Sequence, residues 1–150
     1  MTLVLAVVLA IGVALAAWVR VAPSDAALWN VDPVSAPDPG SSGARFLPGA
    51  GSPIYATSAE TLMAEVARVA GTEPRTRFLA REGDRATWIA RSPFWGFPDY
   101  VTAEAVPVQG GTALAILSRL RFGRNDLGVN RARVERWVGA LDRRLPRSGH

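Results

Sequence analysis

An uncharged, apolar segment at the N-terminus constrains this chain more than any other feature. The run Leu3–Val19 holds seventeen residues without a charged side chain. As a helix rising about 1.5 Å per residue it would be about 26 Å long, close to the roughly 30 Å hydrocarbon core of a bilayer. Trp18 and Arg20 suit the interface at its C-terminal end. Residues 1–20 are therefore predicted to be a transmembrane anchor that meets the lipid bilayer through residues 3–19.

A cleavable signal peptide is the alternative interpretation of the same segment. Ala14-Leu15-Ala16 offers a small-x-small cleavage pattern, but Met1-Thr2 lacks the positive charge that precedes such a signal. We therefore expect an uncleaved, single-pass anchor. Arg20 counts toward its own side being cytoplasmic, whereas a folded domain crosses regardless of one flanking charge. We expect a bacterial inner-membrane protein with a periplasmic soluble domain.

Composition removes most catalytic chemistry. All 17 basic residues are arginine, cysteine is absent, and the single histidine is the last residue, His150. Schiff-base lysines, Walker loops, thiolate nucleophiles and sulfur-ligated zinc sites are thereby excluded. We expect no catalytic residue, no cofactor and no metal. Residues 119–150 carry nine arginines against three acids, which favours anionic partners unless the arginines are simply spread over a solvated face.

The rest of the chain divides into three segments. Residues 21–53 contain six prolines among glycines, serines and aspartates, a mixture that resists both helix and strand and predicts a stalk. Residues 54–146 are long enough for one small core and are predicted to form a single α+β domain. Residues 147–150 are a tail.

Hydrophobic periodicity predicts the elements of the domain. A short first strand precedes a helix that begins at a capping box formed by Thr57 and Glu60 and ends near Gly71. Four period-two runs predict strands in meander order, at 75–81, 85–91, 99–108 and 112–121.

A last helix over about 129–145 completes the predicted domain. Its apolar residues fall on one side, with four arginines largely on the solvent side: Arg133, Arg136, Arg143 and Arg144. The order β-α-β-β-β-β-α predicts a small antiparallel sheet of about four to five strands, with two helices covering one face.

Residues 90–101 carry more aromatic side chains than a connection between strands requires. Three rings surround Gly96 and Pro98, an apolar surface in need of a cover. This predicts an interaction surface formed by Phe94, Trp95, Phe97 and Asp99. The alternative is that the rings close the open end of the core.

Residues 118–137 place arginines around a turn that leads into the last helix. The free amides and positive dipole end of a helix N-terminus favour an anion there. The predicted anion ligands are Arg91, Arg119, Arg124, Asp126, Asn130 and Arg131. The alternative assigns Asp126 and Asn130 to helix capping or to pairing with a nearby arginine.

Both segments resemble the two signature regions of a bacterial and plastid family catalogued as domain of unknown function 1499. The resemblance covers roughly residues 54–145. Its most specific positions are Ser118, Arg119, Gly123, Asp126, Gly128, Val129, Asn130, Arg131, Arg133 and Glu135, and the first segment matches at Arg91, Ser92, Phe97 and Asp99. Tyr100 stands where a second acidic residue is expected, and Asn125 where serine is common. The resemblance implies an architecture, candidate positions and membrane association, but no reaction.

Three functions compete on these observations. A non-enzymatic binding module is favoured, in which the arginines hold an anionic small molecule or lipid headgroup near the bilayer. The alternative is an interaction protein that docks on a membrane-protein partner through the aromatic segment. A hydrolase with Asp99 or Asp126 as general base is least favoured, because few other proton carriers remain. Nucleic acid is not an expected partner, since no strand interleaves basic and aromatic residues.

Overall fold

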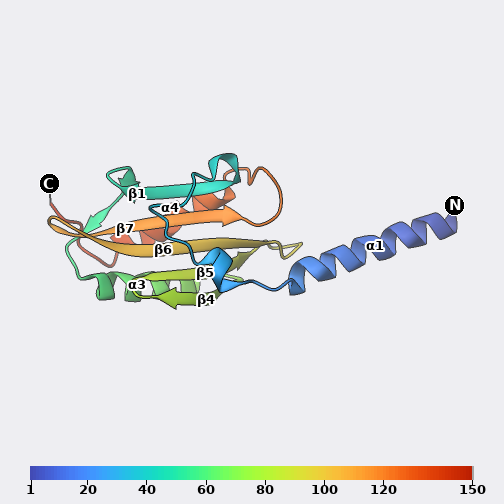
Figure 1. The fold of residues 1–150 in the computed structure, drawn as a ribbon, viewed down its shortest axis with the longest axis horizontal. Helices are drawn as coiled ribbons and strands as arrows, with labels where there is room; N and C mark the ends of the chain where they lie inside the picture. Colours follow the sequence, from blue (N-terminus) through green and yellow to red (C-terminus); the bar gives the residue numbers. More distant parts are fainter. Residues whose placement is uncertain (150) are drawn as a thin grey trace.

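The computed structural model describes residues 1–149 and has two parts, a long helix and a sheet domain (Figure 1). Helix α1 (Thr2–Val21) projects from one end of the domain and is apolar and long enough to cross a membrane. The remaining elements, in chain order, are α2 (Ala26–Trp29), the 3₁₀ helix η1 (Gly40–Ser42), β1 (Gly43–Pro48), β2 (Gly51–Ser52), β3 (Ile54–Tyr55), α3 (Ala59–Thr72), β4 (Thr76–Glu82), β5 (Arg85–Arg91), β6 (Pro98–Val108), β7 (Gly111–Leu120) and α4 (Val129–Asp142).

The strands form one sheet in the order β2-β1-β7-β6-β5-β4, with β3 also paired to β7. Strands β4 to β7 make the predicted antiparallel meander, with turns at Gly83-Asp84 and Gln109-Gly110. The α+β class and the N-terminal apolar helix are therefore confirmed. The sheet is mixed, because β1 and β2 run parallel, and it has more strands than the four to five expected.

Helices α3 and α4 cover one face of the sheet, behind it in Figure 1. Helix α3 buries Leu62, Met63, Val66, Val69 and Ala70, the apolar stripe that its periodicity predicts.

The start of α3 lies one residue later than the expected cap. Ser58 accepts from the amide of Thr61, while the carbonyl of Thr57 accepts from the Thr112 hydroxyl of β7. Thr57 is thus held by the sheet and Ser58 is left to cap the helix.

The additional strands come from the segment that the sequence assigns to the stalk. Residues 43–46 of β1 pair with β7, and Gly43 passes so close to the carbonyl of Ser118 that a side chain there would collide with it. Periodicity did not predict this strand, because it is short and lies between prolines and glycines. Its backbone hydrogen bonds depend on pairing with β7.

The residues before β1 cover the face of the sheet opposite the helices (Figure 1). The Trp29 ring stacks on Tyr100 at 3.7 Å between centroids, and Asn30 accepts from the Thr87 hydroxyl at 2.9 Å. We call residues 22–36 the covering segment. It packs on the domain rather than extending as a free spacer, so both faces of the central strands are buried.

Candidate anion-binding site

The loop between β5 and β6 brings several polar groups to the end of the sheet nearest α1. The amide of Ser92 donates to the Phe97 carbonyl, and the amide of Phe97 donates back to the Ser92 hydroxyl, both at 3.0 Å. Gly96 supplies the left-handed conformation that closes the turn, with φ of 70°. Arg91 donates to the Gly96 carbonyl at 2.8 Å, so the loop fixes the arginine that ends β5.

An open groove of about 420 Å³ lies beside this loop. Its lining residues are Arg20, Arg75, Thr76, Arg77, Arg91, Ser92, Pro93 and Gly96. Four arginines therefore line one groove, from the end of α1, the residue before β4, the start of β4 and the end of β5, and we call this the arginine groove.

The charges of the arginine groove are not compensated by protein carboxylates. Across residues 1–149, none of its four arginines forms an ion pair. Burial lowers the pKa of Arg91, and the nearby cations Arg77, Arg121 and Arg20 lower it further. Each positive charge makes the next less favourable, so an anion placed among them would relieve the repulsion.

A smaller pocket of about 250 Å³ adjoins the arginine groove, and Arg75 and Arg91 line both. Here α4 adds two further arginines that are neutralised. Arg136 pairs with Glu73 at 2.5 Å, and Arg133 pairs with Asp99 at 3.2 Å. Two of the four arginines that line this pocket are therefore neutralised by carboxylates, whereas none of the four in the arginine groove is.

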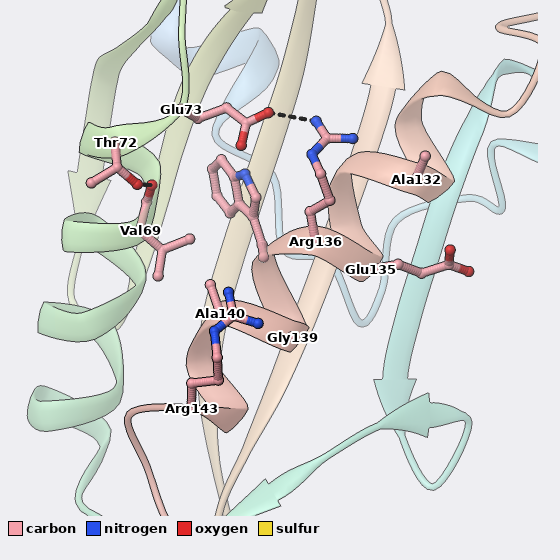
Figure 2. A pocket seen from close by; sticks show the side chains of 10 residues that line it. Val69, Thr72, Glu73, Ala132, Glu135, Arg136, Gly139, Ala140 and Arg143 are labelled. Carbon is pink, nitrogen blue, oxygen red and sulfur yellow. Dashed lines mark hydrogen bonds and ion pairs between the residues drawn. The ribbon is translucent and has the colours of Figure 1, made fainter.

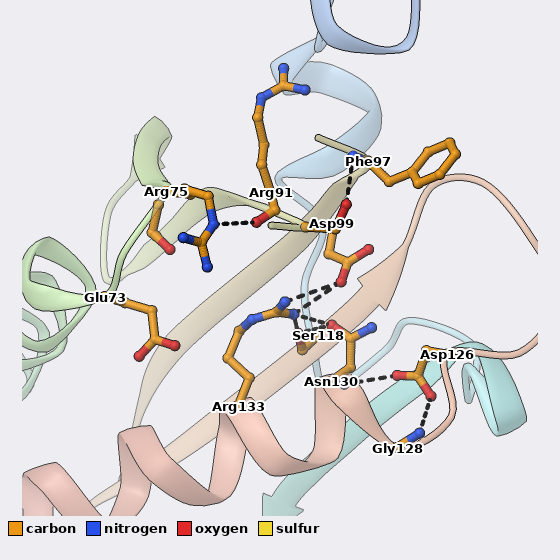
Figure 3. A network of polar contacts seen from close by, with 12 residues as sticks. Glu73, Arg75, Arg91, Phe97, Asp99, Ser118, Asp126, Gly128, Asn130 and Arg133 are labelled. Carbon is orange, nitrogen blue, oxygen red and sulfur yellow. Dashed lines mark hydrogen bonds and ion pairs between the residues drawn. The ribbon is translucent and has the colours of Figure 1, made fainter. Parts of the chain in front are cut away.

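A buried network underlies this smaller pocket (Figure 3). Arg133 is only 6% exposed and donates to Asp99, to the Ser118 hydroxyl at 3.3 Å and to the Asn130 side-chain carbonyl. Burial raises the pKa of Asp99, and the Arg133 charge opposes that rise. Arg133 was expected on the solvent side of the last helix; this expectation is wrong, because the three acceptors lie on the sheet side.

Asp126 occupies the N-terminus of α4, where the sequence predicts an anion. Its carboxylate accepts from the amides of Gly128 and Asn130, both at 2.9 Å. Slight burial alone would raise the pKa of Asp126, but these hydrogen bonds hold it below its usual value. A protein carboxylate thus takes the place of a ligand at this helix end, as the capping alternative proposed.

The other predicted anion-binding arginines, Arg119, Arg124 and Arg131, lie in three different places. Arg119 lies over the Trp29 ring at 4.8 Å on the face of the covering segment. Arg131 lies over the Phe46 ring at 5.5 Å. The carbonyl of Arg124 accepts from the Ser41 hydroxyl at 3.0 Å, while the rest of the residue is exposed. Of the six predicted anion ligands, the lining of the arginine groove includes Arg91.

The remaining groove arginines were not among the predicted ligands. Arg20, Arg75 and Arg77 stand far apart from Arg91 in the sequence. They meet because α1 ends beside the loop that follows β5, and because β4 pairs with β5. The predicted hairpin of 75–81 and 85–91 already places Arg75 and Arg77 near Arg91, but no sequence pattern brings Arg20 to them, so only the tertiary structure completes the groove.

The predicted interaction residues divide between two places. Phe94 and Trp95 remain 85% and 63% exposed, so they do not close the core. Asp99 instead belongs to the buried network with Arg133.

A further cavity of about 740 Å³ lies between the end of α3 and α4 (Figure 2). The Glu73–Arg136 pair stands at one side of it, and its other charged residues are Glu135 and Arg143. Two acids and two arginines cancel, so this cavity has no net preference for an anion. In the part of the chain that the structure describes, no group of three His, Cys, Asp or Glu residues is placed to hold a metal ion.

Fold and site together define a small α+β domain with a mixed sheet, carried on an apolar helix, with uncompensated arginines where the two meet. The chain belongs to the family described as "protein of unknown function (DUF1499)", whose model matches residues 38–141. This confirms the family that the two signature segments indicate. Neither the curated proteins nor the solved structures contain a match.

Proposed function

We propose that this protein is a membrane-anchored, non-enzymatic binding module that holds an anionic group in the arginine groove. The observation that carries the proposal is the convergence of Arg20, Arg75, Arg77 and Arg91 without a carboxylate partner among residues 1–149. Guanidinium groups match phosphate and carboxylate oxygens two at a time, and Arg keeps its charge at any physiological pH.

The chemistry of the ligand follows from the position of the groove. Arg20 belongs to the last turn of α1, so a bilayer crossed by α1 would place the groove at the height of lipid headgroups. The ligand is accordingly a phosphate- or carboxylate-bearing group, from an anionic lipid or from a small molecule at the membrane surface. We further propose a single-pass protein of a bacterial inner membrane, with the domain on the periplasmic side.

Titration of the full-length protein in neutral detergent micelles tests this function. The probes are dioctanoyl phosphatidylglycerol, for a lipid source, and inorganic pyrophosphate, for a soluble source. We expect Arg77→Ala to weaken binding about tenfold, the loss of one charge-assisted hydrogen bond of roughly 1.5 kcal/mol. Rising salt should weaken it further, since the groove is open to solvent.

Arg81→Ala is the matched control for that experiment. Arg81 lies on the same strand as Arg77, but beside the turn at the far end of the sheet, where it donates to the Gly83 carbonyl. Removing it takes away the same charge from outside the groove, so binding should be unchanged. Equal losses in both variants, or no binding of either probe to the unaltered protein, would contradict the proposal.

A further inference from the structure

The aromatic loop, defined as Pro93–Phe97, lies against the C-terminal half of α1. Trp95 and Phe97 line an apolar cavity of about 330 Å³ together with Gly12, Leu15, Ala16 and Val19. Arg20 donates to the Phe94 carbonyl at 2.7 Å, which fixes the loop backbone beside the last turn of the helix. The rings therefore reach back along α1, away from the sheet.

The depth of these rings can be measured along the helix. Gly12 stands nine residues before Val21, the end of α1, which is about 14 Å at 1.5 Å per residue. The 20 residues of α1 extend about 30 Å, the thickness of the hydrocarbon core. Side chains beside residues 12–16 would then lie below the headgroups of any bilayer that α1 crosses.

We propose that the aromatic loop inserts into the same membrane leaflet that α1 crosses, so that the bilayer is the partner of this surface. The outer side of the loop is apolar, since Phe94 and Trp95 remain 85% and 63% exposed. Lipid is the occupant that the apolar surface of α1 already requires, and the loop continues that surface. An apolar patch continuous with a membrane span is covered by the same acyl chains.

Several backbone groups of the loop already have hydrogen-bond partners within the protein. Unsatisfied carbonyl and amide groups are costly in lipid. Arg20 and Arg91 donate to the carbonyls of Phe94 and Gly96, and the reciprocal pair of Ser92 and Phe97 satisfies two amides and a third carbonyl. These five backbone groups would therefore stay hydrogen-bonded if the outward rings entered the bilayer.

A cluster of three aromatic rings lies where α1 meets the domain. Trp18 lies 5.6 Å from Phe122, and Phe97 lies 6.2 Å from Phe122, between ring centroids. Arg121 lies over the Phe122 ring at 5.0 Å. Aromatic rings with arginines are the composition of membrane interfaces. The inference depends on the membrane anchoring proposed above but not on the binding of an anion.

Depth measurement by spin labelling tests this insertion in the full-length protein, reconstituted in phosphatidylcholine nanodiscs. The sequence holds no cysteine, so Phe94→Cys, Gln109→Cys and Val8→Cys each give one label site. Gln109 is exposed in the turn at the far end of the sheet, and Val8 is exposed within α1. We expect labels at 8 and 94 to be accessible to oxygen and shielded from a water-soluble nickel chelate, and the label at 109 to show the reverse.

The outcomes separate the insertion from the anchor and from the anion site. A lipid-exposed label at 8 with a water-exposed label at 94 would overturn the insertion and assign the aromatic loop to a protein partner. Water exposure at both positions would overturn the anchor and the insertion together. Trp95→Asp in the Phe94→Cys background should move the label toward water, whereas Arg77→Ala should leave it in place even though it weakens anion binding.

Discussion

Two groups of arginines lie within one small region of this molecule and have opposite surroundings. Arg133 is buried, and all its partners are protein groups: Asp99, Ser118 and Asn130. The arginine groove opens to solvent, and none of its four arginines forms an ion pair within residues 1–149. The difference shows that the arginines of one sequence region divide into residues that pair within the fold and residues that have no carboxylate partner among residues 1–149. The groups that surround an arginine, and not its residue type, decide to which of the two sets it belongs.

The largest expected effect comes from breaking the buried ion pair between Arg133 and Asp99. Asp99→Asn keeps the shape of the side chain but leaves Arg133 as an uncompensated buried cation. We expect the free energy of unfolding to fall by about 3 kcal/mol, the usual result of removing one partner of a buried ion pair. Urea unfolding of the full-length protein in detergent, followed by tryptophan fluorescence, measures it.

Asp38→Asn is the control for that variant, because Asp38 is exposed and its ion pair with Arg45 is long, at 3.8 Å. Its effect should stay within about 0.5 kcal/mol. Adding Arg133→Gln to Asp99→Asn should recover part of the stability, since the unpaired charge is then removed. An Asp99→Asn protein as stable as the Asp38→Asn protein would show that the pair is not structural.

An intermediate effect is expected at the N-terminus of α4, where the Asp126 carboxylate accepts hydrogen bonds from free backbone amides. Asp126→Ala should lower the free energy of unfolding by about 1 kcal/mol, the usual value of a helix cap. Because the fold lowers the pKa of Asp126, its charge stabilises fully above the unfolded pKa of about 3.9, and this contribution disappears as pH falls through the lower folded value. The difference between variant and unaltered protein should therefore shrink below about pH 4.

Asn125→Ala checks the origin of that pH dependence. Asn125 accepts from the amide of Leu127 in the same turn but carries no charge. Its effect on stability should not change between pH 3 and pH 7 by more than about 0.3 kcal/mol, since nothing at that site titrates. A parallel pH dependence in both variants would mean that the carboxylate of Asp126 is not its source.

The smallest effect on stability is expected inside the arginine groove. Arg77→Ala should change the free energy of unfolding by less than about 0.5 kcal/mol, because its side chain has no hydrogen-bond partner within residues 1–149. Any change should be a gain at low salt, where repulsion from the other groove arginines is strongest. A loss above about 1 kcal/mol would place Arg77 with Arg133 among the structural arginines.

Sequence periodicity predicted α3, the β4 to β7 meander and α4, because a regular apolar period runs along each of these elements; the predicted last helix, which reaches about residue 145, extends three residues past the end of α4. It missed β1, whose pairing depends on β7 and whose short run lies among prolines and glycines. The sequence did hold one signal for the buried network. Asn130 and Arg133 fall on the same helical face as Val134 and Trp137, so two polar residues stand on the apolar stripe. The arginine groove had only a partial signal, because the predicted hairpin sets Arg75 and Arg77 near Arg91 whereas Arg20 is added by tertiary contacts alone.

The covering segment also determines how far this domain can move. Ser24, three residues after α1 ends, already bonds its hydroxyl to that of Tyr100 at 2.7 Å, and Pro23 accepts from Arg121 at 2.9 Å. The connection between α1 and the sheet is short and is hydrogen-bonded to β6 and the end of β7. A change in the tilt of α1 would therefore change the orientation of the domain. Under the proposed membrane anchoring, the domain would be held at the bilayer, and the proposed ligand would have to reach it along the membrane surface.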